Sequence, residues 1–175
     1  MSNQRTSYRV PREHGPKVVA IGGGHGLSNM LRGLKAYTEN LSAIVTVADD
    51  GGGSDMLRQD LGMPPPGDIR NCMEALANTE PLMSELMHYR FSDGSLAGQS
   101  FGNLFLAALN GVSSSFEEAV MKMNEVLAVT GKVLPVTNAN CNLVADFENG
   151  ASVVGESKIA AKKKEQNCRI RRVRL

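Results

Sequence analysis

Residues 17–30 read KVVAIGGGHGLSNM, an apolar run followed by a cluster of four glycines and one histidine. The run at residues 17–21 is rich in β-branched side chains and ends at the glycines, which predicts a buried β-strand. Apolar residues then recur at a spacing of three and four, at Leu27, Met30, Leu31 and Leu34. This spacing predicts an amphipathic helix that follows the glycines directly and extends to about residue 37.

A second strand is predicted at residues 41–48, so the two strands and the helix between them form a βαβ unit. Strands joined in this way lie parallel and are covered by helices. Further helices are predicted at residues 56–61, 68–77, 81–89, 101–109 and 116–129, with Asp68 as the N-cap of the second of these. The pattern then changes to strands, at 133–134, 143–147, 151–154 and 170–175, with a hairpin turn at 148–150. The predicted fold class is α/β, a parallel sheet flanked by helices, with a β-rich C-terminal segment.

Composition and charge restrict the class of protein further. The chain has 175 residues, of which 42% are hydrophobic and 21% charged, as in an ordinary globular domain. We therefore expect a polar N-terminal arm at residues 1–16 and one domain at residues 17–175. The arm lacks the apolar core of a signal peptide and no apolar run is long enough to span a bilayer, so we expect no membrane partner. Three widely spaced cysteines predict neither disulfides nor a zinc site and favour a cytoplasmic location.

The glycine cluster after the first predicted strand suits a phosphate-binding loop. Glycines let backbone N–H groups approach a ligand closely, and the helix behind them adds partial positive charge. The candidate phosphate-binding residues are Gly22, Gly23, Gly24, His25 and Gly26. A dinucleotide fingerprint would need a third glycine where Leu27 or Asn29 stands, and a P-loop would need a lysine after the glycines, so neither motif is complete. A tight turn that binds nothing is the alternative.

A second glycine-rich loop, DDGGGS at residues 49–54, follows the second predicted strand. Ligands of open α/β sheets bind at the carboxyl ends of the strands, so both loops should face one crevice. Asp49 and Asp50 offer carboxylates to ribose hydroxyls, to Mg²⁺ or to a reacting group, and Asp50 is our candidate metal ligand. The candidate nucleotide-binding residues of this loop are Gly51, Gly52 and Ser54. The alternative is a solvated Asp-Gly turn.

The C-terminal segment is strongly basic, although the whole chain has a formal net charge of +1. Residues 158–175 contain eight Lys or Arg residues and one Glu. Such a run would suit nucleic-acid phosphates, but we favour an exposed linker at residues 162–164 and a strand at 170–175 whose basic side chains face solvent. We therefore expect no nucleic-acid partner. An unpaired edge of the sheet would favour a homo-oligomer.

Five motifs occur in order along the chain. They are IGGGHGLS at residues 21–28, TVADDGGGS at 46–54, PPGDIRNC at 65–72, GNL at 102–104 and GESKI at 155–159. Together they resemble the YvcK-type gluconeogenesis factor family, which is related to the CofD-type 2-phospho-L-lactate transferases. The resemblance extends from about residue 17 to residue 175 and implies a Rossmann-like fold. Members of the family are about twice as long as one domain, so we expect this chain to be a truncated part of a larger domain.

The resemblance implies a bacterial protein that binds a nucleotide or a UDP-sugar such as UDP-N-acetylglucosamine and influences central carbon metabolism and cell shape. It places Asp49, Asp50 and Asp68 near a metal or a reacting group, and it adds Asn71, Gly102 and Asn103 to the nucleotide-binding residues. Mg²⁺ is the cofactor that it implies, without a bound flavin or NAD. The main interpretation is a binding protein without catalysis. The alternatives are a CofD-like phospholactyl transferase that releases GMP with the help of Mg²⁺, and an NAD-dependent oxidoreductase.

Overall fold

The computed structural model describes residue 13 and residues 15–175. Its centre is a parallel sheet of three strands in the order β1 (Val18–Gly22), β2 (Leu41–Val45) and β3 (Lys132–Pro135). The predicted polar arm at residues 1–16 lies almost wholly outside the described residues. The parallel pairing of β1 with β2 confirms the βαβ unit that the sequence predicts.

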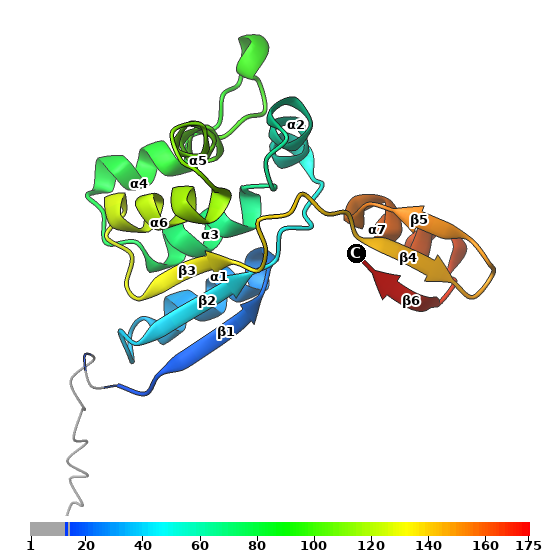
Figure 1. The fold of residues 1–175 in the computed structure, drawn as a ribbon, viewed down its shortest axis with the longest axis horizontal. Helices are drawn as coiled ribbons and strands as arrows, with labels where there is room; N and C mark the ends of the chain where they lie inside the picture. Colours follow the sequence, from blue (N-terminus) through cyan, green and yellow to red (C-terminus); the bar gives the residue numbers. More distant parts are fainter. Residues whose placement is uncertain (1–12, 14) are drawn as a thin grey trace, which may run out of the picture.

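Helices cover one face of this sheet, as Figure 1 shows. The helices that contact the strands are α1 (Gly24–Leu34), α3 (Gly67–Leu76) and α6 (Phe116–Val126). Farther from the sheet, α5 (Phe101–Gly111) packs on α3 and α6, and α2 (Gly52–Leu61) and α4 (Pro81–His88) pack on α5, with the short 3-10 helix η2 (Gly94–Leu96) before α5. Helix α1 packs against α3, and α6 packs against β3. The covered face of the sheet is fully apolar, with Ala20, Ala43 and Val133 buried. On the opposite face Val19 and Ile21 are 62% and 71% exposed.

A small unit stands beside this main body, which we define as residues 15–135 (Figure 1). The small unit, residues 144–174, contains β4 (Val144–Phe147), β5 (Ser152–Val154), α7 (Glu156–Gln166) and β6 (Ile170–Arg174). Its strands form an antiparallel sheet in the order β5-β4-β6, and α7 packs against β4 and β5. Ala145, Phe147 and Ile159 form its own apolar cluster. Residues 136–143 connect the two parts and are called the linker below.

The structure confirms the predicted fold class, a parallel sheet flanked by helices with a β-rich C-terminal segment, and it confirms the hairpin between β4 and β5. Three local predictions were wrong. Helix α2 begins at Gly52 instead of residue 56, because the glycines and Ser54 form its first turn. Asp68 is not the N-cap of α3: the helix begins at Gly67 after Pro66, whose carbonyl accepts from the N–H of Arg70.

The third correction concerns residues 162–164, which lie within α7 and not in a linker. The apolar pattern of the sequence does not predict this helix, because α7 buries only Ile159. Glu156 in the first turn and Lys163 and Lys164 in the last turn complement the helix dipole. Within the described part of the chain, none of the helices is both long and apolar enough to cross a membrane.

Candidate functional site

A cleft of about 560 Å³ lies where the carboxyl ends of β1 and β2 meet the first turn of α7. Three segments of the main body and one of the small unit form its wall. The lining residues are Gly23, Gly24, His25, Thr46, Asp49, Asp50, Gly51, Asp68, Asn71, Glu156, Ser157 and Ala160. The cleft therefore occupies the position at which open α/β sheets bind their ligands.

The first wall of the cleft is the start of α1. Gly23 is the N-cap of this helix and offers no side chain to the free N–H groups of the first turn. Asp68 of α3 supplies the missing acceptor, because its carboxylate accepts a hydrogen bond from the backbone N–H of Gly24. Thr46 donates to the same carboxylate at 3.5 Å. A Cβ at Gly23 would overlap the Thr46 hydroxyl and lie 2.5 Å from Asp68 Oδ2, so the close approach requires glycine here.

The second wall repeats this arrangement at the start of α7. Gly155 is the N-cap, with φ at +103°, and it too lacks a capping side chain. Asp50 from the loop before α2 takes that place, since its Oδ1 accepts from the backbone N–H of Ser157 at 2.7 Å. A Cβ at Gly155 would collide with Asp50 Oδ2. Two helices that face one cleft are thus each capped by an aspartate from a distant segment.

The cleft is strongly acidic. Burial raises the pKa of Asp68, and the negative charge of Asp49 raises it further. Burial also raises the pKa of Glu156, followed by the charges of Asp49, Asp68 and Asp50. Among the described residues that line the cleft, His25 alone has a basic side chain. The site therefore favours a cation or a protonated group near these carboxylates.

Eight of the residues that the sequence predicts for a site come together in this cleft. They are Gly23, Gly24, His25, Asp49, Asp50, Gly51, Asp68 and Asn71. Six others do not line it: Gly22, Gly26, Gly52, Ser54, Gly102 and Asn103. Gly22 ends β1, Gly26 lies in the first turn of α1, and Gly52 begins α2. Ser54 is buried, with its hydroxyl in the space that a Cβ at Gly67 would occupy.

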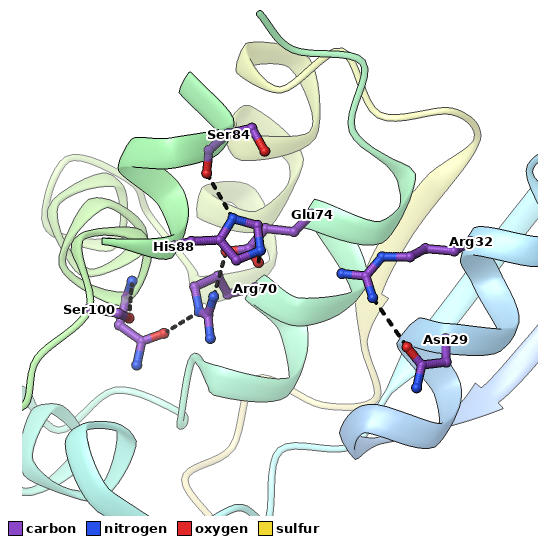
Figure 2. Close-up of polar contacts among 8 residues, drawn as sticks. Asn29, Arg32, Arg70, Glu74, Ser84, His88 and Ser100 are labelled. Atoms are coloured by element: carbon purple, nitrogen blue, oxygen red, sulfur yellow. Dashed lines mark hydrogen bonds and ion pairs between the residues drawn. The ribbon is translucent and has the colours of Figure 1, made fainter. Parts of the chain in front are cut away.

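A separate polar network of Arg70, Glu74 and His88 lies beside the cleft helices (Figure 2), and Asn103 and Gly102 of α5 contact its arginine. Asn103 Oδ1 accepts from Arg70 Nε at 2.9 Å, and a Cβ at Gly102 would lie 2.5 Å from Arg70 Cδ. Arg70 also pairs with Glu74 at 2.5 Å, and Glu74 pairs with His88 at 3.1 Å. This network holds α3 in place behind the cleft, so Asn103 and Gly102 support the helix that carries Asp68 and Asn71.

Sequence reasoning gave no site role to Thr46, Glu156, Ser157 and Ala160, although all four line the cleft. Three of them belong to α7, whose distance from the glycine loops along the chain hides their proximity in space. The sequence feature that could have pointed to them is the motif GESKI at 155–159, in which a glycine and a glutamate precede Ile159, the one apolar residue of the motif.

The fold and the cleft define an α/β protein of Rossmann-like type with an acidic cleft at the carboxyl ends of its parallel strands. Comparison with known families agrees with this class: the family model described as "2-phospho-L-lactate transferase CofD" matches residues 18–175. The chain belongs to the CofD family.

Curated relatives that the chain resembles are designated gluconeogenesis factors. The chain is 51% identical over 161 residues to the "Gluconeogenesis factor" of Bacillus subtilis (strain 168), covering 91% of this chain and 50% of that protein. A protein of Thermoanaerobacterium thermosulfurigenes, with the same designation in provisional form, is 65% identical over 162 residues, or 93% of this chain and 50% of that protein. The chain thus spans about half the length of these relatives.

A solved structure supports the fold independently. The crystal structure of protein BH3568 from Bacillus halodurans superposes with a TM-score of 0.83 at 46% sequence identity, over 90% of this chain and 50% of that one. A second crystal structure of the same protein, described as a member of the UPF0052 family, gives a TM-score of 0.82 at 45% identity, over the same shares of the two chains.

The contact of Gly23 with Asp68 and Thr46 predicts the effect of one added methyl group. Gly23→Ala should cost about 1–3 kcal/mol of unfolding free energy, because the Cβ forces Asp68 and Thr46 away from the start of α1. Gly26→Ala is the matched control, since a Cβ there meets nothing within 4 Å. That variant should be as stable as the wild type or up to about 1 kcal/mol more stable, because alanine favours the helix. Urea unfolding checks both, and equal stabilities would contradict the proposed contact.

The raised pKa of Asp68 predicts a dependence of stability on pH. A carboxyl whose pKa is raised by folding contributes stability that is fully present below its ordinary pKa of 3.8 and is lost as the pH rises through the folded pKa. Asp68→Asn removes this loss and keeps an oxygen for the Gly24 N–H. We expect the variant to be more stable than the wild type at neutral pH.

The difference between Asp68→Asn and the wild type should disappear below pH 3.8, where both side chains are neutral. Unfolding free energies measured at a series of pH values check this. Asp60→Asn, at an exposed position on α2, is the control and should follow the wild type throughout. A gain in stability for Asp68→Asn that is independent of pH would mean that the charge of Asp68 is not its cause.

Proposed function

We propose that the cleft binds a nucleotide diphosphate or a nucleotide sugar, with UDP-N-acetylglucosamine as the leading ligand, and that the chain acts as a regulator of central carbon metabolism and cell shape. The observation that carries this proposal is the meeting of two helix N-termini, those of α1 and α7, at one cleft. Each leaves N–H groups without intrahelical acceptors, and phosphate oxygens are natural acceptors for them. The whole protein's activity is proposed on the same basis, because the chain spans about half of its relatives.

The free space beside Gly24 would let a ligand approach the backbone of α1 closely. Gly24 has φ at +66°, and a Cβ built on it would meet nothing within 4 Å. Space is therefore free beside the first residue of the helix. His25, the next residue, is exposed and lines the cleft, so its imidazole is available to a phosphate oxygen.

The acidic wall supports Mg²⁺ as part of the bound complex. A diphosphate next to Asp49, Asp50, Asp68 and Glu156 would be repelled unless a cation lay between them. Among the described residues, no three His, Cys, Asp or Glu side chains are arranged to hold a metal by themselves. Mg²⁺ is commonly held by one or two carboxylates together with substrate phosphates, which fits this donor set. Asp50 and Asp49 are the residues that would hold it, and the ion would neutralise phosphate charge.

The designation of the Bacillus subtilis relative as a gluconeogenesis factor supports a regulatory role. The description of the family model supports the second candidate, a phospholactyl transferase that releases GMP. Such an enzyme must hold a guanosine diphosphate-linked donor and a deazaflavin acceptor together, since positioning of two substrates supplies much of the rate. An assay of GMP release from these two substrates distinguishes the candidates, and steady turnover would establish the transferase.

Isothermal titration with UDP-N-acetylglucosamine, GDP and NADH, each with and without Mg²⁺, tests the binding proposal. We expect UDP-N-acetylglucosamine to bind most tightly and to lose at least about tenfold in affinity, or ~1.4 kcal/mol, when Mg²⁺ is removed. Tight binding of NADH without affinity for the uridine nucleotide would favour the NAD-dependent oxidoreductase instead and overturn the proposal.

A single substitution in the second loop tests the role of Mg²⁺. Asp49→Asn should weaken binding in the presence of Mg²⁺ and reduce the difference that Mg²⁺ makes, because it removes a carboxylate that the ion would need. Asp49 is the better position for this test, since Asp50 also holds the start of α7. Asp60→Asn, on the exposed side of α2, is the matched control and should leave the titration unchanged. A Mg²⁺ dependence that is identical in both variants would place Asp49 outside the ion's surroundings.

A further inference from the structure

Arg58 is the one arginine among the described residues that is more than nine-tenths buried. It lies on α2 and is 6% exposed. Its Nε donates to Asn140 Oδ1 at 2.6 Å, and its Nη2 donates to the carbonyl of Cys141 at 3.0 Å and to Asn142 Oδ1 at 2.6 Å. All three acceptors belong to the linker between the main body and the small unit. We propose that Arg58 is a positioning residue that fixes this linker and thereby holds the start of α7 at the cleft.

The partners of Arg58 are unusual for a buried cation. Within the part of the chain that the structure describes, no carboxylate pairs with it, and its Nη1 is buried without a hydrogen-bond partner. A buried charge without a counter-ion is costly, and here amide and carbonyl oxygens alone compensate it. Only the planar, five-donor guanidinium reaches three acceptors on consecutive residues at once. The arrangement therefore costs stability in a place where an apolar side chain would pack, which points to a positional role.

The small unit needs such a fixed point, because its own elements make few contacts with the main body. None of its described strands and helices packs as a layer against the central sheet or against α1–α6. The start of the linker is fixed by the Val136 N–H, which donates to the carbonyl of Val45, and by Asn138, which bonds with Glu117 of α6. Beyond residue 138, two sets of hydrogen bonds hold the rest of the linker and the small unit: those of Arg58 with residues 140–142, and that of Asp50 with the N–H of Ser157. Both come from residues 50–58, which form the loop before α2 and the first two turns of that helix. The same short segment thus lines the cleft at one end and fixes the linker at the other.

The consequence concerns Glu156 and Ser157, which reach the cleft only if α7 stays where it is. Release of the linker would let the small unit turn away and would take both residues with it. The cleft would lose one of its two helix N-termini and one of its carboxylates. Arg58 does not line the cleft, so any effect that it has on binding acts through α7. The expected loss of ligand affinity rests on the proposed function, whereas the role of Arg58 in holding α7 does not depend on it.

Hydrogen–deuterium exchange of the whole chain tests the proposal without any ligand. Arg58→Met, which keeps the length and removes the donors, should raise exchange at residues 155–160 by at least about tenfold while β1 and β2 keep wild-type protection. Arg32→Met is the matched control: Arg32 is an exposed arginine at the end of α1 with a hydrogen bond to Asn29 (Figure 2) and should leave residues 155–160 unchanged. Exchange at residues 155–160 that matches the wild type would overturn the proposal, and so would an increase spread evenly over the central sheet.

A second variant decides the question if Arg58→Met does not fold. The double substitution Asn140→Ala and Asn142→Ala removes two acceptors from exposed positions and leaves α2 intact. It should raise exchange at residues 155–160 as Arg58→Met does, and unchanged exchange there would overturn the proposal.

Affinity for UDP-N-acetylglucosamine with Mg²⁺ is the second readout. It should fall by about tenfold or more in both linker-releasing variants, the scale of one lost contact of ~1.4 kcal/mol, and stay at the wild-type value in Arg32→Met. If the wild-type chain does not bind this probe, the proposed function fails, whereas the exchange measurements still decide the role of Arg58. Wild-type affinity in variants whose residues 155–160 exchange faster would show that α7 does not contribute to the site and would overturn the proposal.

Discussion

The architecture of the cleft depends on two aspartates that cap helices to which they do not belong. Asp68 accepts from the start of α1, and Asp50 accepts from the start of α7. In both cases the local N-cap is a glycine, so no side chain of the helix itself competes for the free N–H groups. Capping from a distance ties α3 to the glycine loop and the loop before α2 to the small unit. The same bonds that complete two helices therefore also bring four segments of the chain around one cleft.

This arrangement has an electrostatic cost. Carboxylates that cap neighbouring helices must lie close to one another, and Asp49 and Glu156 add to their charge. A domain selected only for stability would spread these charges or replace them. Their concentration beside free helix N–H groups gives the cleft both donors and acceptors, which is the combination that a phosphate with a bridging cation requires.

The sequence predicted the parts of the fold that depend on neighbouring residues. Apolar spacing and the glycine cluster located β1, α1 and β2, and the carboxyl-end rule brought the two glycine-rich loops to one crevice. The structure confirms these elements and the parallel sheet. Contacts between residues far apart in the sequence could not be predicted in this way. Asp50 and Ser157 are 107 positions apart, and Arg58 meets its acceptors across 82 to 84 positions. Helix α7 was not predicted because it buries a single residue. Asp68 was predicted to cap its own helix, α3, because an aspartate before an apolar run usually does so, whereas it accepts from the start of α1.

The order of the central sheet has a consequence for the way the chain reaches its structure. β1, α1 and β2 are consecutive, so their pairing needs only local loop closure, whereas β3 pairs with β2 after residues 46–131 have intervened. Closure of that long segment costs more chain entropy and comes later, since non-local contacts slow folding. We therefore expect residues 18–45 to form early, and β3 to join the sheet together with α3 and α6, which it contacts. Asp68 lies in the segment that is expected to form later, so the glycine loop should acquire its capping carboxylate only after its own strands have paired.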